Sequence, residues 1–291
     1  MREDRPSRTA AGVAFRRAAH QVLDRPPVFS DPLARRVLCD EARAALDADP
    51  WRGNRGAALS RLRAFLAVRS RIAEDRLAEA VARGVRQYVV LGAGLDTFAC
   101  RNPFAELRIF EVDHPGTQAW KRERLRAAGL IPSAGTAFVP VDFETQTVAR
   151  ELARYGFDAA GPTAISWLGV VPYLEEPTVW ATLEWVAGVL GEGGHVVFDY
   201  GSEPRWWQFA QRAALRRLAA RVAAAGEPFR TRLRPAHVRR RLTSLGFTAI
   251  ADLDSRELNR RYFAGRKDGL RVGGGGHVVI ASTAGGAWTT S

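Results

Sequence analysis

The strongest fold signal in the chain is Arg86-Gln-Tyr-Val-Val-Leu-Gly-Ala-Gly-Leu-Asp-Thr-Phe-Ala-Cys-Arg101. Residues 88–91 are a short apolar run, which is typical of a strand buried in a parallel sheet. The run stops at Gly92-Ala93-Gly94, where glycine lets the backbone turn tightly and approach a ligand. Phe98 and Ala99 stand near the place of the third glycine of a dinucleotide-binding fingerprint. The stretch therefore predicts a strand leading into a ligand-binding loop, and it argues against a nicotinamide dehydrogenase.

Later strands are expected to end in acidic residues. The apolar segment 108–115 carries Asp113, and the segment 136–141 is followed by Asp142 and Phe143. A carboxylate at the end of such a strand can accept hydrogen bonds from both hydroxyl groups of a ribose. Each acid could instead serve only as a turn residue. Because ligands of open α/β sheets bind at the carboxyl ends of the strands, we expect the glycine loop and both acids to form one site.

These features resemble the class I S-adenosylmethionine-dependent methyltransferases, and more narrowly the leucine carboxyl methyltransferase family with its bacterial O-methyltransferase branch. The resemblance runs from about residue 7 to about residue 200. It implies a Rossmann-like, doubly wound α/β sheet of seven strands and S-adenosyl-L-methionine as the cofactor. The motifs that carry it are Leu-Gly-Ala-Gly-Leu-Asp-Thr97, Phe-Glu-Val-Asp-His-Pro115, Val-Arg-Ser-Arg-Ile-Ala-Glu-Asp75, Ser-Arg-Thr-Ala-Ala-Gly-Val13 and Phe29-Ser-Asp-Pro-Leu33.

The resemblance also implies roles for single residues. In the family an arginine of the helix before the first strand contacts the methionyl carboxylate of the cofactor, and Arg71 is matched to it, with Arg69 as the second choice. The structural alternative for Arg71 is an intrahelical ion pair with Asp75. The other residues expected to bind the cofactor are Gly92, Ala93 and Gly94 of the loop, Asp113 at the ribose, and Asp142 and Phe143 beside the adenine.

The first 85 residues are expected to form a helical N-terminal cap. Apolar residues recur at helical spacing over 9–23, 33–46 and 59–83, and Pro32 suits the first turn of the second helix. After the glycine loop, Asp96 could cap a following helix, and a ligand contact is the alternative.

The rest of the chain is expected to complete the sheet and to cover it. Residues 86–202 form the cofactor-binding core, with strands at 163–168 and 195–200 and a helix at 177–190. The arginine- and alanine-rich part that follows suggests a helical lid over the acceptor. The remaining expected parts are the lid at 203–246, C-terminal strands at 247–283 that include an antiparallel strand at 276–282, and a loose tail at 284–291.

The chemistry of methyl transfer sets modest demands on the protein. The donor is already activated, so the protein mainly has to align the acceptor with the methyl group and exclude water. A carboxylic acid is ionised at neutral pH, whereas a phenol with a pKa of about 10 benefits from a base. No evident base stands in the sequence; His114 and Tyr173 are weak candidates for catalysis, and His114 suits a structural role better. We assign Tyr173, Tyr200 and Arg205 to the acceptor side.

The sequence thus predicts an O-methyltransferase that acts on a carboxylate or phenolic hydroxyl of a small molecule, such as a secondary metabolite. The alternatives are an RNA or protein carboxyl methyltransferase and a non-catalytic cofactor-binding protein. The formal net charge of +12 comes almost entirely from arginine, because Lys121 and Lys267 are the only lysines. Many arginines stand beside acids at helical spacing, as in 69–76, which favours paired helix faces over a nucleic-acid surface.

The remaining composition points to a cytoplasmic protein. Cys39 and Cys100 form no CxxC motif and have no histidine cluster beside them, so we expect neither a metal site nor a disulfide framework. The N-terminus has acids and prolines in place of an apolar signal core. The sequence has no window of about 18 apolar residues, which a membrane span requires.

Overall fold

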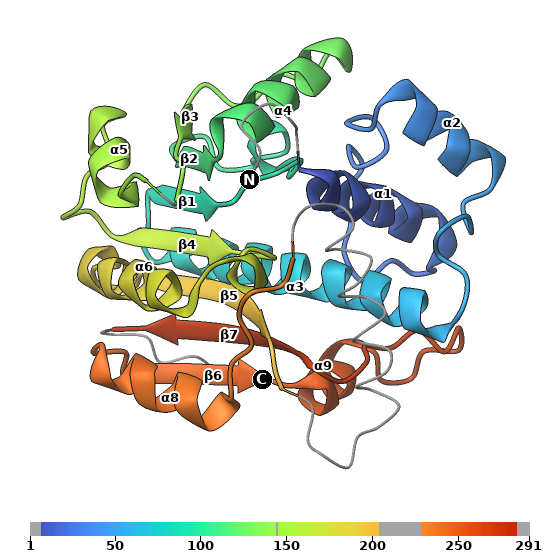
Figure 1. Ribbon diagram of the computed structural model, residues 1–291. Coiled ribbons are helices and arrows are strands. Elements are labelled where there is room, and N and C mark those ends of the chain that lie inside the picture. Colours follow the sequence, from blue (N-terminus) through green and yellow to red (C-terminus); the bar gives the residue numbers. More distant parts are fainter. Residues whose placement is uncertain (1–6, 144, 204–227, 284–291) are drawn as a thin grey trace.

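The computed structural model describes residues 7–143, 145–203 and 228–283. Its centre is a seven-stranded sheet with the order β3-β2-β1-β4-β5-β7-β6 (Figure 1). Strand β7 runs antiparallel to both of its neighbours, and the other pairs are parallel. The doubly wound sheet and its antiparallel strand are therefore confirmed. The strands are β1 (Gln87–Leu91), β2 (Arg108–Asp113), β3 (Thr136–Pro140), β4 (Thr163–Trp167), β5 (His195–Gly201), β6 (Ala249–Leu253) and β7 (Gly276–Ser282).

Helices cover both faces of the sheet and its carboxyl edge. Apolar side chains of α5, α6 and α8 pack on one face, and those of α3 and α9 pack on the other. Helix α1 lies beyond the carboxyl ends of the parallel strands, toward which their arrowheads point in Figure 1. The helices are α1 (Arg8–Leu23), α2 (Asp40–Ala48), α3 (Ala57–Ala82), α4 (Pro115–Ala127), α5 (Val148–Arg154), α6 (Glu176–Val189), α8 (Pro235–Ser244) and α9 (Ser255–Tyr262), with short 3-10 helices η1 (Phe98–Cys100) and η2 (Val171–Tyr173).

Strand β1 shows why its sequence is apolar throughout. Val89 and Leu91 belong to the core cluster under α5 and α6, whereas Tyr88 and Val90 belong to the cluster under α3. Side chains alternate between the faces of a sheet, and here both faces are covered, so neither set can be polar. The strand is fully buried and ends at the glycine loop.

Two helix predictions were wrong in extent. The helix expected over 33–46 is a turn region followed by α2, which begins at Asp40. Asp40 and Glu41 stand in the first turn of α2, where the helix dipole favours negative charge. The helix expected after Asp96 is only the 3-10 turn η1.

The part expected to be a lid, 203–246, includes a helix that packs on the sheet. Residues 235–244 form α8, whose Val238 and Leu242, four positions apart, are buried in the core cluster that contains α6 and β5. This helix therefore covers the sheet, because its apolar spacing gives it a core-facing side. Residues 204–227, with Arg205, and the tail 284–291 lie outside the described residues.

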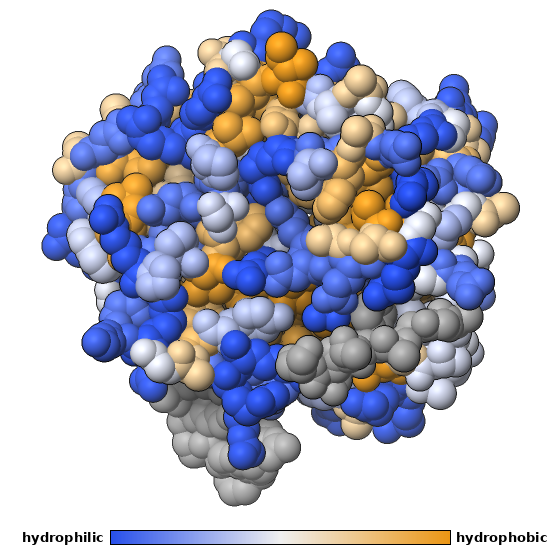
Figure 2. All heavy atoms as spheres, turned by 180° about the vertical axis from the view of Figure 1, so that it is seen from behind, coloured by the Kyte–Doolittle hydropathy of each residue, from blue (hydrophilic) through white to orange (hydrophobic). Residues whose placement is uncertain are grey.

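Within the described parts of the chain, no helix is both long and apolar enough to cross a membrane. Hydrophilic side chains predominate on the face shown in Figure 2, with smaller apolar areas between them.

Candidate active site

The glycine loop joins the carboxyl ends of β1 and β2. The backbone N–H groups of Gly92 and Ala93 both donate to the carbonyl of Val112, at 2.8 and 3.1 Å. Gly92 and Gly94 have φ angles of +69° and +49°, a region that favours glycine. A Cβ atom on Gly92 would lie 2.2 Å from Cγ2 of Val170, so the loop leaves no room for a side chain there. The same contact places the segment after β4 directly against the loop.

Asp113 lies at the end of β2 with both carboxylate oxygens held by backbone donors. Oδ2 accepts from the N–H of Gly94 at 2.5 Å, and Oδ1 accepts from the N–H of His114 at 2.7 Å. Each oxygen of an ionised carboxylate has a second lone pair, so both can accept one more hydrogen bond. Burial raises the pKa of Asp113, and the two backbone hydrogen bonds partly oppose this effect.

The neighbouring sequence-predicted residues lie at the same edge. The N–H of Val141 donates to the carbonyl of Asp113 at 2.8 Å, which brings Asp142 and Phe143 next to the end of β2. Phe143 is partly buried against the core. His114 is the N-cap of α4, and its Nδ1 accepts from the N–H of Gly116 at 3.2 Å. This cap is the structural role that suited His114 in the sequence.

The structure separates the two candidate arginines of α3. Arg71 is half-exposed; its Nε donates to Asp75 at 2.6 Å, and its Nη1 donates to the carbonyl of Val28 at 3.1 Å. It therefore forms the intrahelical pair given above as its structural alternative. Arg69 is buried and pairs with Asp199 at 3.0 Å, at the carboxyl end of β5.

Arg69 lies beside the carboxyl ends of β4 and β5, at the edge where ligands of such sheets bind. A Cβ on Gly169, just after β4, would lie 2.7 Å from Nη2 of Arg69, so the guanidinium occupies the space beside that glycine. Asp199 also accepts from the N–H of Gly169 at 2.6 Å, which fixes the carboxylate between helix and strand. Only Nη1 of Arg69 has a hydrogen-bond partner among the described residues, leaving donors for a ligand. In the sequence, the spacing of the arginines on α3 did not show which of Arg69 and Arg71 faces the sheet.

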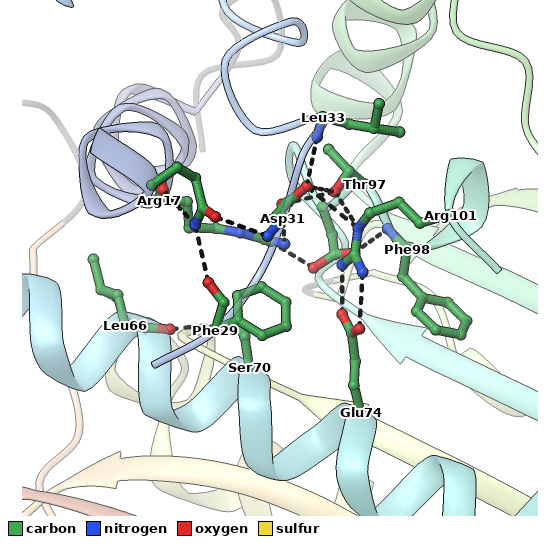
Figure 3. A network of polar contacts seen from close by, with 12 residues as sticks. Arg17, Phe29, Asp31, Leu33, Leu66, Ser70, Glu74, Thr97, Phe98 and Arg101 are labelled. Atoms are coloured by element: carbon green, nitrogen blue, oxygen red, sulfur yellow. Dashed lines mark hydrogen bonds and ion pairs between the residues drawn. The ribbon is translucent and has the colours of Figure 1, made fainter. Parts of the chain in front are cut away.

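A buried network of charges joins the N-terminal helices to the glycine loop (Figure 3). Arg17 of α1 donates to Asp31 at 2.7 Å and to Asp96 of the loop at 2.6 Å. Burial raises the pKa of Asp96, but the charges of Arg17 and Arg101 outweigh burial and hold this pKa well below its usual range. Asp96 also accepts from the N–H of Phe98, the first residue of η1, at 2.7 Å, while the N-cap position of η1 itself is Thr97.

Asp31 is the centre of this network. Its carboxylate accepts from the hydroxyl of Thr97 at 2.8 Å and lies 3.3 Å from Nε of Arg101. Arg101 also forms a two-pronged pair with Glu74 of α3, at 2.5 and 2.8 Å. Sequence reasoning missed this network. The only available signal was the position of Asp31 inside the motif Phe29-Ser-Asp-Pro-Leu33, and the motif does not indicate which residues Asp31 pairs with.

Tyr173 and Tyr200, both expected to bind the acceptor, lie in different elements. Tyr173 is in η2, immediately after the segment that contacts the glycine loop. Tyr200 is buried on β5; its hydroxyl donates to Asp252 at 2.7 Å, and its ring stacks on His277. Asp199 and Tyr200 therefore point to opposite faces of the sheet, as their spacing predicted.

The strand order, the antiparallel β7, and a glycine loop followed by acids at the ends of β2 and β3 define a class I methyltransferase. Residues 10–187 match the family model of leucine carboxyl methyltransferase. A Bacillus subtilis protein, provisionally named S-adenosyl-L-methionine-dependent methyltransferase YktD, is 30% identical over 93% of this chain and 95% of its own length. The chain belongs to the leucine carboxyl methyltransferase family, as its motifs indicated.

Further comparisons agree with this membership. A Mycobacteroides abscessus protein with the same kind of provisional name is 33% identical over 74% of this chain and 68% of its own length. The crystal structure of a DUF574 family protein from Streptomyces avermitilis has a TM-score of 0.58 at 18% identity, covering 94% of this chain and 97% of its own. A Thermobifida fusca structure, provisionally named a methyltransferase, has a TM-score of 0.55 at 19% identity, covering 90% and 99%. The two structures show the fold alone.

The residues at the carboxyl edge fit S-adenosyl-L-methionine, the cofactor that the relatives are named for. Gly92 and Gly94 carry no side chain and leave the loop backbone accessible, and Asp113 has acceptor capacity left for a ribose diol. Arg69 has guanidinium donors without a hydrogen-bond partner among the described residues, and these suit a carboxylate. A planar guanidinium suits a two-pronged carboxylate contact, so we propose Arg69, the second choice from the sequence, for the role first matched to Arg71.

Replacing Arg69 tests this reassignment. The variant Arg69→Gln is expected to bind S-adenosylhomocysteine about tenfold more weakly, because a hydrogen-bonded charge pair is lost. Arg71→Gln is the matched control on the same helix, and its affinity should stay within about twofold of the wild type. Calorimetric titration of the three proteins measures both. Equal affinities for Arg69→Gln and the wild type would contradict the assignment, and loss in Arg71→Gln alone would restore the first choice.

Proposed function

We propose that this S-adenosyl-L-methionine-dependent methyltransferase transfers the methyl group to an oxygen of a small molecule, a carboxylate or a phenolic hydroxyl, and that a carboxylate is the better acceptor. The observation that carries the proposal is the chemistry next to the glycine loop. Leu168 and Val170 follow β4 there, and Val170 touches the loop. The charges beside them, Arg69 and Asp199, already pair with each other.

An acceptor at this position meets few groups that could remove a proton. Tyr173 is a phenol, and its ring is engaged with Phe229 at a centroid distance of 5.3 Å. His114 accepts a hydrogen bond as a helix cap. A carboxylate, with a pKa of about 4, arrives already ionised and needs no base. The family's name adds support, because it describes carboxyl methylation.

The chain's own residues then have three tasks. Asp113 and the loop glycines hold the ribose and adenosine side of the cofactor, while Arg69 holds its carboxylate. When bound, the cofactor supplies a methyl group activated by a sulfonium. The third task falls to Val170, whose side chain lies against Gly92 and directly precedes η2; it lines this part of the proposed site with apolar atoms, which helps to exclude water.

The type of product tests the proposal directly. Wild-type protein is incubated with methyl-deuterated cofactor and a panel of aromatic carboxylic acids, phenols, amines and thiols, and products are found by mass spectrometry. Methyl esters are then recognised because hydroxide cleaves them, whereas aryl ethers resist. Ester or aryl ether formation supports the proposal. Transfer only to amines, thiols or added RNA would overturn it.

The pH profile separates the two oxygen acceptors. With a carboxylate acceptor, kcat/KM should be flat from about pH 6 to about pH 9, because the acceptor is ionised throughout. With a phenol and no base, it should rise about tenfold per pH unit toward a pKa of about 10. Steady-state rates across this range decide between them. If kcat/KM also rises with pH for a carboxylate acceptor, a deprotonation is required, and the proposed transfer without a base is wrong.

A further inference from the structure

The segment 228–234 lies beside η2 and the carboxyl end of β5. The N–H of Arg230 donates to the carbonyl of Pro172 in η2 at 2.8 Å, and the N–H of Leu233 donates to the carbonyl of Gly201 at the end of β5 at 3.1 Å. The segment therefore runs between the ends of β4 and β5, on the orange trace that leads into α8 in Figure 1. Through η2 and Val170 it adjoins the glycine loop.

Arg232 is the arginine of this segment to which the described residues offer no ion pair. Thr231 and Leu233 on either side of it are buried, whereas Arg232 is half-buried. Its neighbours Arg230 and Arg234 lie against Glu175 and Glu203, at 3.3 and 3.0 Å. Arg232 has no ion-pair partner among the residues that the structure describes. Burial lowers the pKa of its guanidinium, with only a partly opposing effect of the Glu203 charge.

Aromatic rings stand next to this guanidinium. Cζ of Arg232 lies 6.0 Å from the centroid of Phe229, and the ring of Phe229 packs on that of Tyr173 at 5.3 Å and 41°. Aromatic rings prefer such tilted or offset packing, and a further flat ring can extend it. A planar guanidinium binds a carboxylate through two parallel hydrogen bonds. The segment thus combines a cation for an acid group with an aromatic platform for the body of the same molecule.

We propose that Arg232, Tyr173 and Phe229 bind the methyl acceptor, and that this acceptor is an aromatic carboxylic acid. This inference rests on the proposed function and names its substrate class. In the transfer, a carboxylate oxygen forms the new bond to the methyl carbon, the bond from that carbon to sulfur breaks with its electron pair left on sulfur, and no proton moves. The ester product is neutral and loses the ion pair with Arg232, which favours its release.

Binding of probe acids tests the site without turnover. Benzoate, 2-naphthoate and their methyl esters are titrated calorimetrically into the wild-type protein loaded with S-adenosylhomocysteine. We expect both acids to bind more tightly than their esters. In Arg232→Gln the acids should bind about tenfold more weakly and the esters with unchanged affinity, because only the acids lose a charged hydrogen-bond pair. Arg232→Lys should fall between, since it keeps the charge without the planar fork.

The matched control is Arg230→Gln, two residues away and exposed, which should bind the acids as the wild type does. Thermal unfolding and S-adenosylhomocysteine titration of each variant show that the fold and cofactor site are intact. Failure to bind either acid, or equal acid affinity in Arg232→Gln and the wild type, overturns the inference. The proposed function fails separately, through methyl transfer to acceptors other than oxygen in the wild-type protein.

Discussion

Replacing Asp113 by alanine is expected to weaken the binding of S-adenosyl-L-methionine about 100-fold, which corresponds to about 3 kcal/mol. The carboxylate at the end of β2 is the proposed acceptor for both ribose hydroxyls, and hydrogen bonds to a charged group contribute most. The same carboxylate holds the N–H groups of Gly94 and His114. Its removal therefore also loosens the loop that receives the cofactor.

The measurement is calorimetric titration of S-adenosyl-L-methionine and S-adenosylhomocysteine into wild type, Asp113→Ala and Asp113→Asn. The asparagine variant keeps the shape but loses the charge and one acceptor, so it should lie between the other two. Glu106→Ala, an exposed acid just before β2, is the control and should bind as the wild type does. Unchanged affinity in a folded Asp113→Ala would show that this acid is only a turn residue.

The position of Asp113 also predicts a pH dependence. Burial raises its pKa in the folded protein above the ordinary value of an aspartate. Two ribose hydroxyls donate to the two carboxylate oxygens, and a proton on either oxygen would take away acceptor capacity. Cofactor binding therefore favours the ionised form of Asp113. The affinity for the cofactor should therefore be highest above the pKa of Asp113 in the folded protein and should decline as the pH falls through that pKa. The decline should occur at a higher pH than for an ordinary aspartate. Asp113→Asn should lack this decline.

The sheet could be derived from the sequence because its signals are local. The run 88–91 is apolar on both faces, the glycine loop follows it, and an acid follows each of the next two strands. The hydrophobic pattern and these residues at the strand ends therefore locate the strands. Helix boundaries were harder. Leu33 to Leu46 has helical spacing throughout, yet the helix begins at Asp40, where two acids suit its first turn.

The position of a candidate site residue could be predicted only where it follows from the residue's place on a strand. Asp113 and Asp142 lie at strand ends, so topology alone brings them to the loop. Arg69 and Arg71 are two positions apart on α3, and which of them faces the sheet depends on the rotation of the helix against β4 and β5. Arg232 was beyond reach for a related reason, since its place between η2 and β5 is set by contacts across the chain.

The largest expected effect on stability comes from Asp31→Ala. Asp31 has a fully buried side chain, and it accepts from Arg17, Thr97 and the N–H of Leu33 at 2.7, 2.8 and 3.1 Å. Removing it leaves the guanidinium of Arg17 buried with Asp96 as its remaining close partner, and it leaves Arg101 with Glu74. Breaking a buried ion pair from one side costs about 3–5 kcal/mol, because the desolvated charge stays behind.

Denaturant unfolding of the wild type and Asp31→Ala measures this loss as a lower free energy of unfolding. Asp47→Ala is the matched control, because Asp47 pairs with Arg35 on the exposed surface, where water screens the pair, and its loss should change stability little. Asp31→Ala should also weaken cofactor binding, since the network positions Asp96 and Thr97 of the loop. If both variants unfold at the same denaturant concentration as the wild type, the network does not hold the N-terminal helices to the loop. If only Asp31→Ala is destabilised and its cofactor affinity falls with it, the cap and the cofactor site form one cooperative unit.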